Sequence, residues 1–197
     1  MNKVVGILLA AGKSSRFGSN KCLALLPDQT AMGIRSARNL ASQVDEMIVV
    51  IPQDNAALDA LFSNEGCGVI VCHTADLGMS ESLKVGVGYF DSEVTAFIIA
   101  LADMPLIKSE TYRSVVDELM RNEGIVSPQH YGKRGHPVGF NAKYKNELLA
   151  LQGDQGAKVL LQKYVKDITL LNVDDPGIHQ DFDTRSLFEQ FFDEHTA

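Results

Sequence analysis

Residues 8–21 have the sequence LLAAGKSSRFGSNK, in which an apolar run gives way to small residues, glycines and three cations within nine residues. The apolar residues, which extend back to Val4, are typical of a buried strand. Glycine lets backbone N–H groups approach phosphate oxygens without an intervening Cβ. The cations Lys13, Arg16 and Lys21 can neutralise the charge of those oxygens. The stretch therefore predicts a strand followed by an anion-binding loop.

Two common phosphate-binding loops do not fit these residues. A Walker loop needs four residues between its glycines and then Lys-Ser/Thr, but Gly12 and Gly18 enclose five residues and Ser19 follows. A dinucleotide-binding loop needs G-x-G-x-x-G, and the spacing of Gly6, Gly12 and Gly18 does not supply it. On these residues alone, a flexible basic loop between strand and helix stays open as an alternative to a phosphate-binding loop.

Apolar runs alternate with helical patterns on either side of this stretch. Strands are predicted at residues 4–9, 46–51, 69–72 and 95–101, and helices at 31–42, from 55, at 80–89 and at 108–122. Because the runs are continuous, helices are expected to cover both faces of the sheet. The chain is therefore predicted to have an α/β, Rossmann-like, mostly parallel sheet. The loop after Leu9 and the turn after Leu101 should lie at the same edge of that sheet.

Composition limits the classes of function. With 197 residues and 45% hydrophobic content, the chain is predicted to form a single domain over residues 1–197. Its net charge of −7 argues against nonspecific binding to nucleic acid or to a membrane, and no apolar stretch is long enough to span one. The three cysteines, Cys22, Cys67 and Cys72, have no C-x-x-C spacing, so neither a disulfide framework nor a zinc site is indicated. A reducing cytoplasm is the expected location.

Several polar residues could serve either the fold or the chemistry of a site. Asp103 ends an apolar strand just before Met104-Pro105, where a carboxylate can bind Mg²⁺ or cap a turn. Ser80 stands where a helix is predicted to begin, and Asp154 is predicted to cap the helix that runs to Lys163. His136 can bind an anion, carry a proton or serve a structural hydrogen bond.

One family shares these motifs in the same order. Residues 9–21 match L-A-A-G-x-S-x-R-x-G-x-x-K at every fixed position. This resembles the N-terminal motif of the molybdenum cofactor nucleotidyltransferases, the MobA/MocA-like NTP transferases. The further similar segments are GMSESL at 78–83, LADMP at 101–105, RGHPV at 134–138, LQGDQGA at 151–157 and DFDT at 181–184. The chain departs from the family pattern at residues 25–33, which lack a second proline, and after Thr184, where Arg185-Ser186 replaces Pro-Glu.

The resemblance implies a fold of the nucleotide-diphospho-sugar transferase type and a set of site residues. Arg16, Lys21 and Asp103 take the catalytic roles, with Mg²⁺ held by Asp103 and Asp181. The segment containing His136 and Pro137 faces the acceptor, whereas Asp183 is expected to cap a final helix at residues 185–192. The implied nucleotide-binding residues are Leu9, Ala10, Ala11, Gly12, Ser14, Arg16, Lys21, Gly78, Ser82 and Asp103.

The implied reaction transfers CMP from CTP to the terminal phosphate of a molybdopterin-type cofactor and releases pyrophosphate. Guanylyl-transferring members carry Leu-Ala-Gly-Gly, so Ala11, whose methyl group narrows the space beside the base, favours CTP over GTP. Two alternatives stay open. One is nucleotidyl transfer to another phosphorylated small molecule, such as a sugar or polyol phosphate. The other is a non-catalytic carrier that delivers molybdenum cofactor to a partner oxidoreductase such as a molybdenum hydroxylase.

Overall fold

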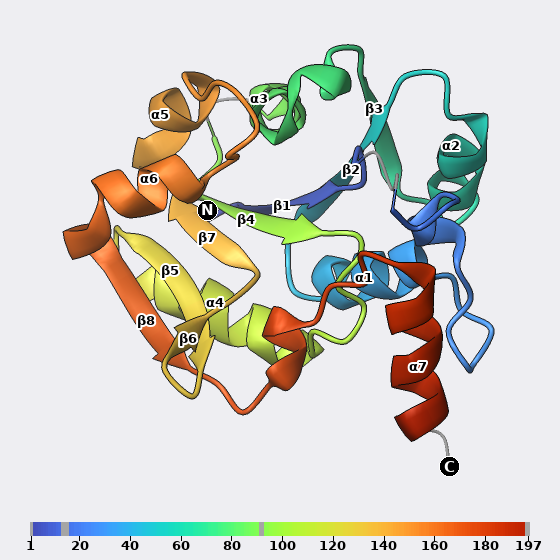
Figure 1. Ribbon diagram of the computed structural model, residues 1–197. Coiled ribbons are helices and arrows are strands. Elements are labelled where there is room, and N and C mark those ends of the chain that lie inside the picture. The colour runs from blue at the N-terminus through green and yellow to red at the C-terminus, as the bar shows by residue number, and fades with distance from the viewer. Residues whose placement is uncertain (1, 13–15, 91–92, 196–197) are drawn as a thin grey trace.

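The computed structural model of the chain describes residues 2–12, 16–90 and 93–195. A central sheet has the strand order β3-β2-β1-β4-β7-β5-β6, and β8 pairs with β5 (Figure 1). The strands are β1 (Val4–Leu9), β2 (Glu46–Pro52), β3 (Gly68–Cys72), β4 (Ala96–Leu101), β5 (Ile125–His130), β6 (Lys133–Arg134), β7 (Val138–Asn141) and β8 (Ile168–Asn172).

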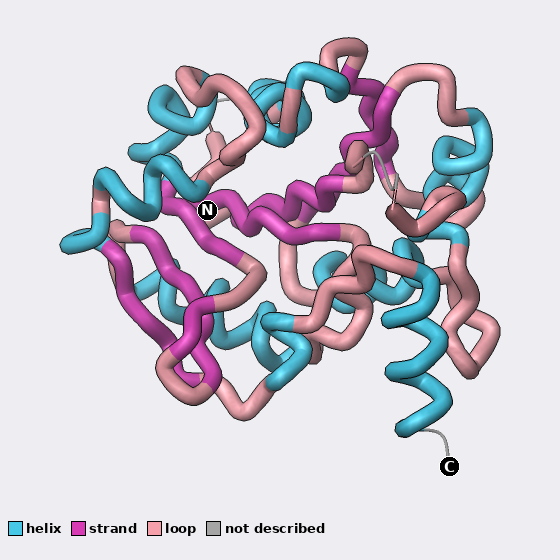
Figure 2. The backbone as a smooth tube through the Cα atoms, in the orientation of Figure 1, coloured by secondary structure: helices cyan, strands magenta, loops and turns pink. Residues whose placement is uncertain are grey.

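The sheet has a parallel part and a mixed part. Strands β3, β2, β1 and β4 run parallel, and Leu9 of β1 lies opposite Leu101 of β4. The loop after β1 and the turn after β4 therefore share one edge, as predicted; Figure 2 shows the described residues of both connections in pink. Beyond β4 the sheet is mixed, since β7 is antiparallel to β4 and β5, whereas β8 is parallel to β5. The predicted α/β sheet is confirmed, but β5, β6 and β8 were missed.

Helices cover both faces of the sheet. Successive β1 residues point to opposite sides, and because those on both sides are apolar, each face needs a covering layer. Val4 and Leu8 pack in a core with α1, α2 and α4, whereas Val5 and Ile7 pack in a second core with α3, α5 and α6 (Figure 1). The helices are α1 (Met32–Ala41), α2 (Ala56–Ser63), α3 (Met79–Tyr89), α4 (Ser109–Arg121), α5 (Lys145–Leu149), α6 (Lys158–Lys163) and α7 (Arg185–His195). Among the described helices none is long and apolar enough to cross a membrane.

A third, smaller hydrophobic cluster lies apart from these two cores. It joins Phe17, from the loop after β1, to Phe182 and to Phe188 of α7. Leu26 and Met32 complete its buried part. The cluster therefore brings the C-terminal helix against the segment that follows β1, and Figure 1 shows α7 beside that segment.

Candidate nucleotide-binding site

Two cavities open at the carboxyl ends of the parallel strands. The first has a volume of about 540 Å³ and is lined by the ends of β1 and β4, the loop after β1, the start of α3 and the segment around residues 181–183. Its lining includes most of the residues singled out in the sequence: Leu9, Ala10, Ala11, Gly12, Arg16, Lys21, Gly78, Ser82, Asp103 and Asp181. Ser14 lies outside the described residues.

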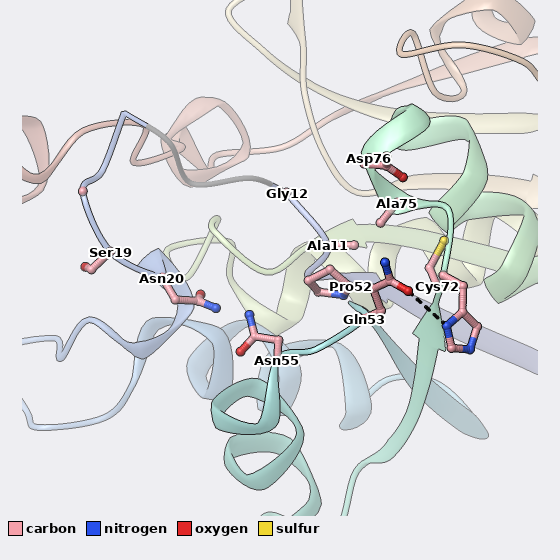
Figure 3. A pocket seen from close by; sticks show the side chains of 12 residues that line it. Ala11, Gly12, Ser19, Asn20, Pro52, Gln53, Asn55, Cys72, Ala75 and Asp76 are labelled. Carbon is pink, nitrogen blue, oxygen red and sulfur yellow. Dashed lines mark hydrogen bonds between the residues drawn. The ribbon is translucent and has the colours of Figure 1, made fainter.

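The second cavity, of about 550 Å³, shares Ala11, Gly12, Ala75 and Asp76 with the first (Figure 3). Residues that follow β2 and β3 form its far wall. There His73 Nδ1 lies 3.4 Å from Gln53 Oε1, and Figure 3 marks this contact with a dashed line. Neither residue was singled out in the sequence, although both follow predicted strands that end at the same sheet edge. The two cavities together extend from the glycine loop across the ends of β2 and β3.

Lys21 lies between two carboxylates. It begins a short 3-10 helix, η1 (Lys21–Leu23), which Asn20 caps by accepting a hydrogen bond from the Cys22 N–H (3.2 Å). The Lys21 ammonium forms an ion pair with Asp103, and its Nζ lies 3.4 Å from Asp183 Oδ1. Burial alone would lower the pKa of Lys21, but Asp103 and Asp183 outweigh that effect, so the pKa is raised and the ammonium stays charged.

The carboxylates of Asp103, Asp181 and Asp183 form a cluster. One oxygen from each lies within 4.8 Å of the others, and the group sits at the edge of the first cavity. Carboxylate oxygens are the ligands that Mg²⁺ and Mn²⁺ prefer, so these residues fit a divalent cation. Three carboxylates this close repel one another unless a cation offsets their charge.

Asp183 does not cap the final helix, so that prediction was wrong. The hydroxyl of Thr184 accepts a hydrogen bond from the Leu187 N–H (3.3 Å) at the start of α7. Asp183 instead lies 3.0 Å from Arg16 Nη2. The helix could begin without it because Thr is also a good N-cap residue.

Asp154 also acts on a different helix from the one predicted. The Met79 N–H at the start of α3 donates to Asp154 Oδ1 (3.0 Å), whereas α6 has Ala157 at its N-cap and no side-chain cap. Gly78 is required there, because its φ is 127° and a Cβ would lie 2.7 Å from the Gly153 carbonyl oxygen. The LQGDQGA segment therefore holds the start of α3, whose Ser82 lines the cavity.

The predicted acceptor residues lie outside the lining of both cavities. The His136 N–H donates to the Ile178 carbonyl (3.1 Å), and its ring Nδ1 is buried without a hydrogen-bond partner among the described residues. Burial lowers the pKa of His136, while the carboxylates of Asp103 and Asp181 raise it in part. The imidazole is therefore neutral at pH 7. Pro137, which follows it, is buried.

Comparison with known proteins gives the family. Residues 6–168 match the model of the MobA-like NTP transferase domain, so the chain belongs to this family. Purine catabolism protein PucB of Bacillus subtilis is 26% identical over 94% of each chain. Molybdenum cofactor cytidylyltransferase of Escherichia coli is 28% identical over 70% of each chain.

A solved structure has the same fold. Rv0371c from Mycobacterium tuberculosis superimposes with a TM-score of 0.85 at 25% identity and covers 98% of both chains. A second crystal structure of that protein, in complex with manganese, has a TM-score of 0.75 at 25% identity over 87% of this chain and 89% of the other. The chain is thus a nucleotidyltransferase by family.

Proposed function

We propose that this MobA-like NTP transferase transfers CMP from CTP to the terminal phosphate of a molybdopterin-type cofactor, with release of pyrophosphate. The observation that carries the proposal is the cluster of Lys21, Asp103 and Asp183 beside the glycine loop, where cationic and metal-binding groups meet at one cavity. The similarity to a molybdenum cofactor cytidylyltransferase supports the choice of acceptor. We further propose that residues 1–197 act as one domain in the cytoplasm and pass their product to a molybdenum hydroxylase.

Arg16 and Lys21 would hold the triphosphate together with backbone N–H groups of the loop that contains Gly12. A phosphate oxygen of the acceptor attacks the α-phosphorus in line; one P–O bond forms as the bond to the β-phosphate oxygen breaks. The acceptor phosphate is already ionised near neutral pH, so no side chain needs to remove a proton. The developing charge of pyrophosphate stays beside the Lys21 ammonium, whose raised pKa keeps it protonated.

Asp103 and Asp181, with Asp183 beside them, would hold the divalent metal, for which we propose Mg²⁺. When bound, the ion offsets negative charge on the phosphate oxygens. The carboxylates do no acid–base work in this scheme. They orient the ion and, through the Lys21–Asp103 ion pair, keep the lysine at the cavity edge.

The experiment that tests this function is pyrophosphate release by purified protein with Mg²⁺ and molybdenum cofactor, offering CTP, GTP, ATP and UTP separately. We expect release with CTP. Release with GTP alone would keep the chemistry and overturn the choice of base. If none of the four nucleotides gives release, the same assay is repeated with sugar and polyol phosphates as acceptors. Release with one of them would indicate a different phosphorylated acceptor. Binding of molybdenum cofactor without any release would indicate a cofactor carrier.

A further inference from the structure

The third hydrophobic cluster connects the two charged segments of the site. Phe17 directly follows Arg16, and Phe182 lies between Asp181 and Asp183. Phe188 of α7 contacts both rings: its centroid lies 6.0 Å from that of Phe17 and 5.3 Å from that of Phe182, edge to face in each case. We call Phe17, Phe182 and Phe188 the aromatic cluster.

The charged residues beside the aromatic cluster need to be held in place. Asp181 and Asp183 lie with Asp103 in a group of three carboxylates. Their mutual repulsion is offset only in part by the two cations that contact them, Lys21 and Arg16. Phe182 is fully buried, and aromatic burial of this kind is a large stabilising contribution. It therefore fixes the backbone between the two carboxylates against their repulsion.

Arg16, like Asp181 and Asp183, is adjacent in the sequence to a buried aromatic residue, Phe17. The Arg16 side chain is 73% exposed, whereas Phe17 is 3% exposed. An exposed ion pair such as Arg16–Asp183 contributes little by itself to holding a loop. The buried neighbour must therefore supply most of the restraint on the segment that carries Arg16.

The aromatic cluster is also distinct from the scaffold of the fold. It is separate from both cores that pack on the sheet, and Phe182 and Phe188 lie beyond residues 6–168, the part that matches the family model. On these grounds we propose that Phe188 is a positioning residue that holds the Arg16 segment and the Asp181–Asp183 segment at a fixed separation for a metal-bound triphosphate. This inference rests on the proposed function for the identity of the ligand.

Phe188→Ala tests the inference, with Leu187→Ala as the matched control because Leu187 is on the same helix and 53% exposed. Each protein is titrated with Mn²⁺ in the absence of nucleotide, and free Mn²⁺ is measured by electron paramagnetic resonance below the unfolding temperature of every variant. We expect the dissociation constant for Mn²⁺ to rise about tenfold in Phe188→Ala and to stay at the wild-type value in Leu187→Ala. A tenfold rise is the lower end of the effect seen when residues that orient metal ligands are replaced. Phe188→Leu, which keeps an apolar side chain, should restore most of the affinity.

A second measurement does not depend on the metal or on the reaction. Trypsin cleaves after arginine, and native-state cleavage at Arg16, identified by mass spectrometry, reports how firmly that segment is held. We expect faster cleavage at Arg16 in Phe188→Ala than in Leu187→Ala. If the wild type binds no Mn²⁺ or turns over no nucleotide, the proposed function fails, and this cleavage still decides the positioning role. Unchanged cleavage together with unchanged Mn²⁺ affinity, even with a lowered melting temperature, would overturn it.

Discussion

The Arg16 guanidinium lies 3.0 Å from the Asp183 carboxylate, so an ion pair connects the loop after β1 to a segment near the C-terminus. The same carboxylate lies 3.4 Å from Lys21 Nζ. Asp183 therefore contacts both cations that we expect to hold the triphosphate. An incoming nucleotide must compete with Asp183 for them unless a metal ion engages the carboxylate.

Asp183→Asn should have opposite effects on nucleotide binding and on metal binding. Without divalent metal, nucleotide triphosphate should bind up to about fivefold more tightly, because Arg16 and Lys21 lose a competing charge worth up to about 1 kcal/mol. The affinity for Mn²⁺ should fall. Equilibrium binding of CTP with EDTA and Mn²⁺ titration measure the two effects. Weaker CTP binding in EDTA would contradict this role of Asp183.

Lys21→Ala should lower the rate of transfer by about 100- to 1,000-fold, the cost of removing a charged group from a developing anion. The fold should persist because Lys21 lies outside the cores on the two sheet faces. Pyrophosphate release and circular dichroism measure the two quantities. Turnover at the wild-type rate in the folded variant would remove Lys21 from the mechanism.

The parallel part of the sheet could be predicted because β1 and β4 are uninterrupted apolar runs, buried along almost their whole length. The mixed part could not. β5 has the sequence IVSPQH, in which proline and polar residues break the pattern, and its pairing with β7 and β8 depends on contacts between distant segments.

The candidate site also has one part that could be predicted from the sequence and one part that could not. Lys21 and Asp103 follow strands that were predicted, so their meeting at one edge could be expected. The contact between Lys21 and Asp183 spans 162 residues, and nothing local in DFDT distinguishes a carboxylate that faces two cations from one that caps a helix. Asp154 was assigned to the wrong helix for the same reason, since the partner of a capping side chain was sought nearby in sequence.

Asp154→Ala should lower the free energy of unfolding by about 1 kcal/mol, the usual cost of removing a helix cap, because the Met79 N–H would lose its acceptor. The KM for nucleotide should rise more than kcat falls, since α3 carries Ser82 into the cavity wall. Urea unfolding and steady-state kinetics measure these effects. Gln152→Ala, at an exposed position of the same loop, serves as the control and should change neither quantity.

His136 makes stability depend on pH. Burial holds the pKa of its imidazole below the ordinary value, so the unfolded chain takes up this proton at a higher pH than the folded chain does. The contribution is fully present above about pH 6.5 and is lost as the pH falls toward the folded pKa. In urea unfolding at pH 7.5 and pH 5.5, His136→Gln should lose less stability than the wild type. Parallel pH profiles would contradict this.

Ala11→Gly tests the basis of nucleotide choice. Ala11 lines both cavities, and its methyl group occupies space at the junction between them. Removing one methyl group from a binding wall typically changes discrimination by about tenfold or somewhat more. We expect kcat/KM for GTP to rise relative to CTP by about tenfold, with kcat/KM for CTP changed less. Competition between the two nucleotides in one reaction, with the products separated by chromatography, measures this ratio directly. A ratio equal to that of the wild type would mean that other groups, such as Gln53 and His73 on the far wall of the second cavity, select the base.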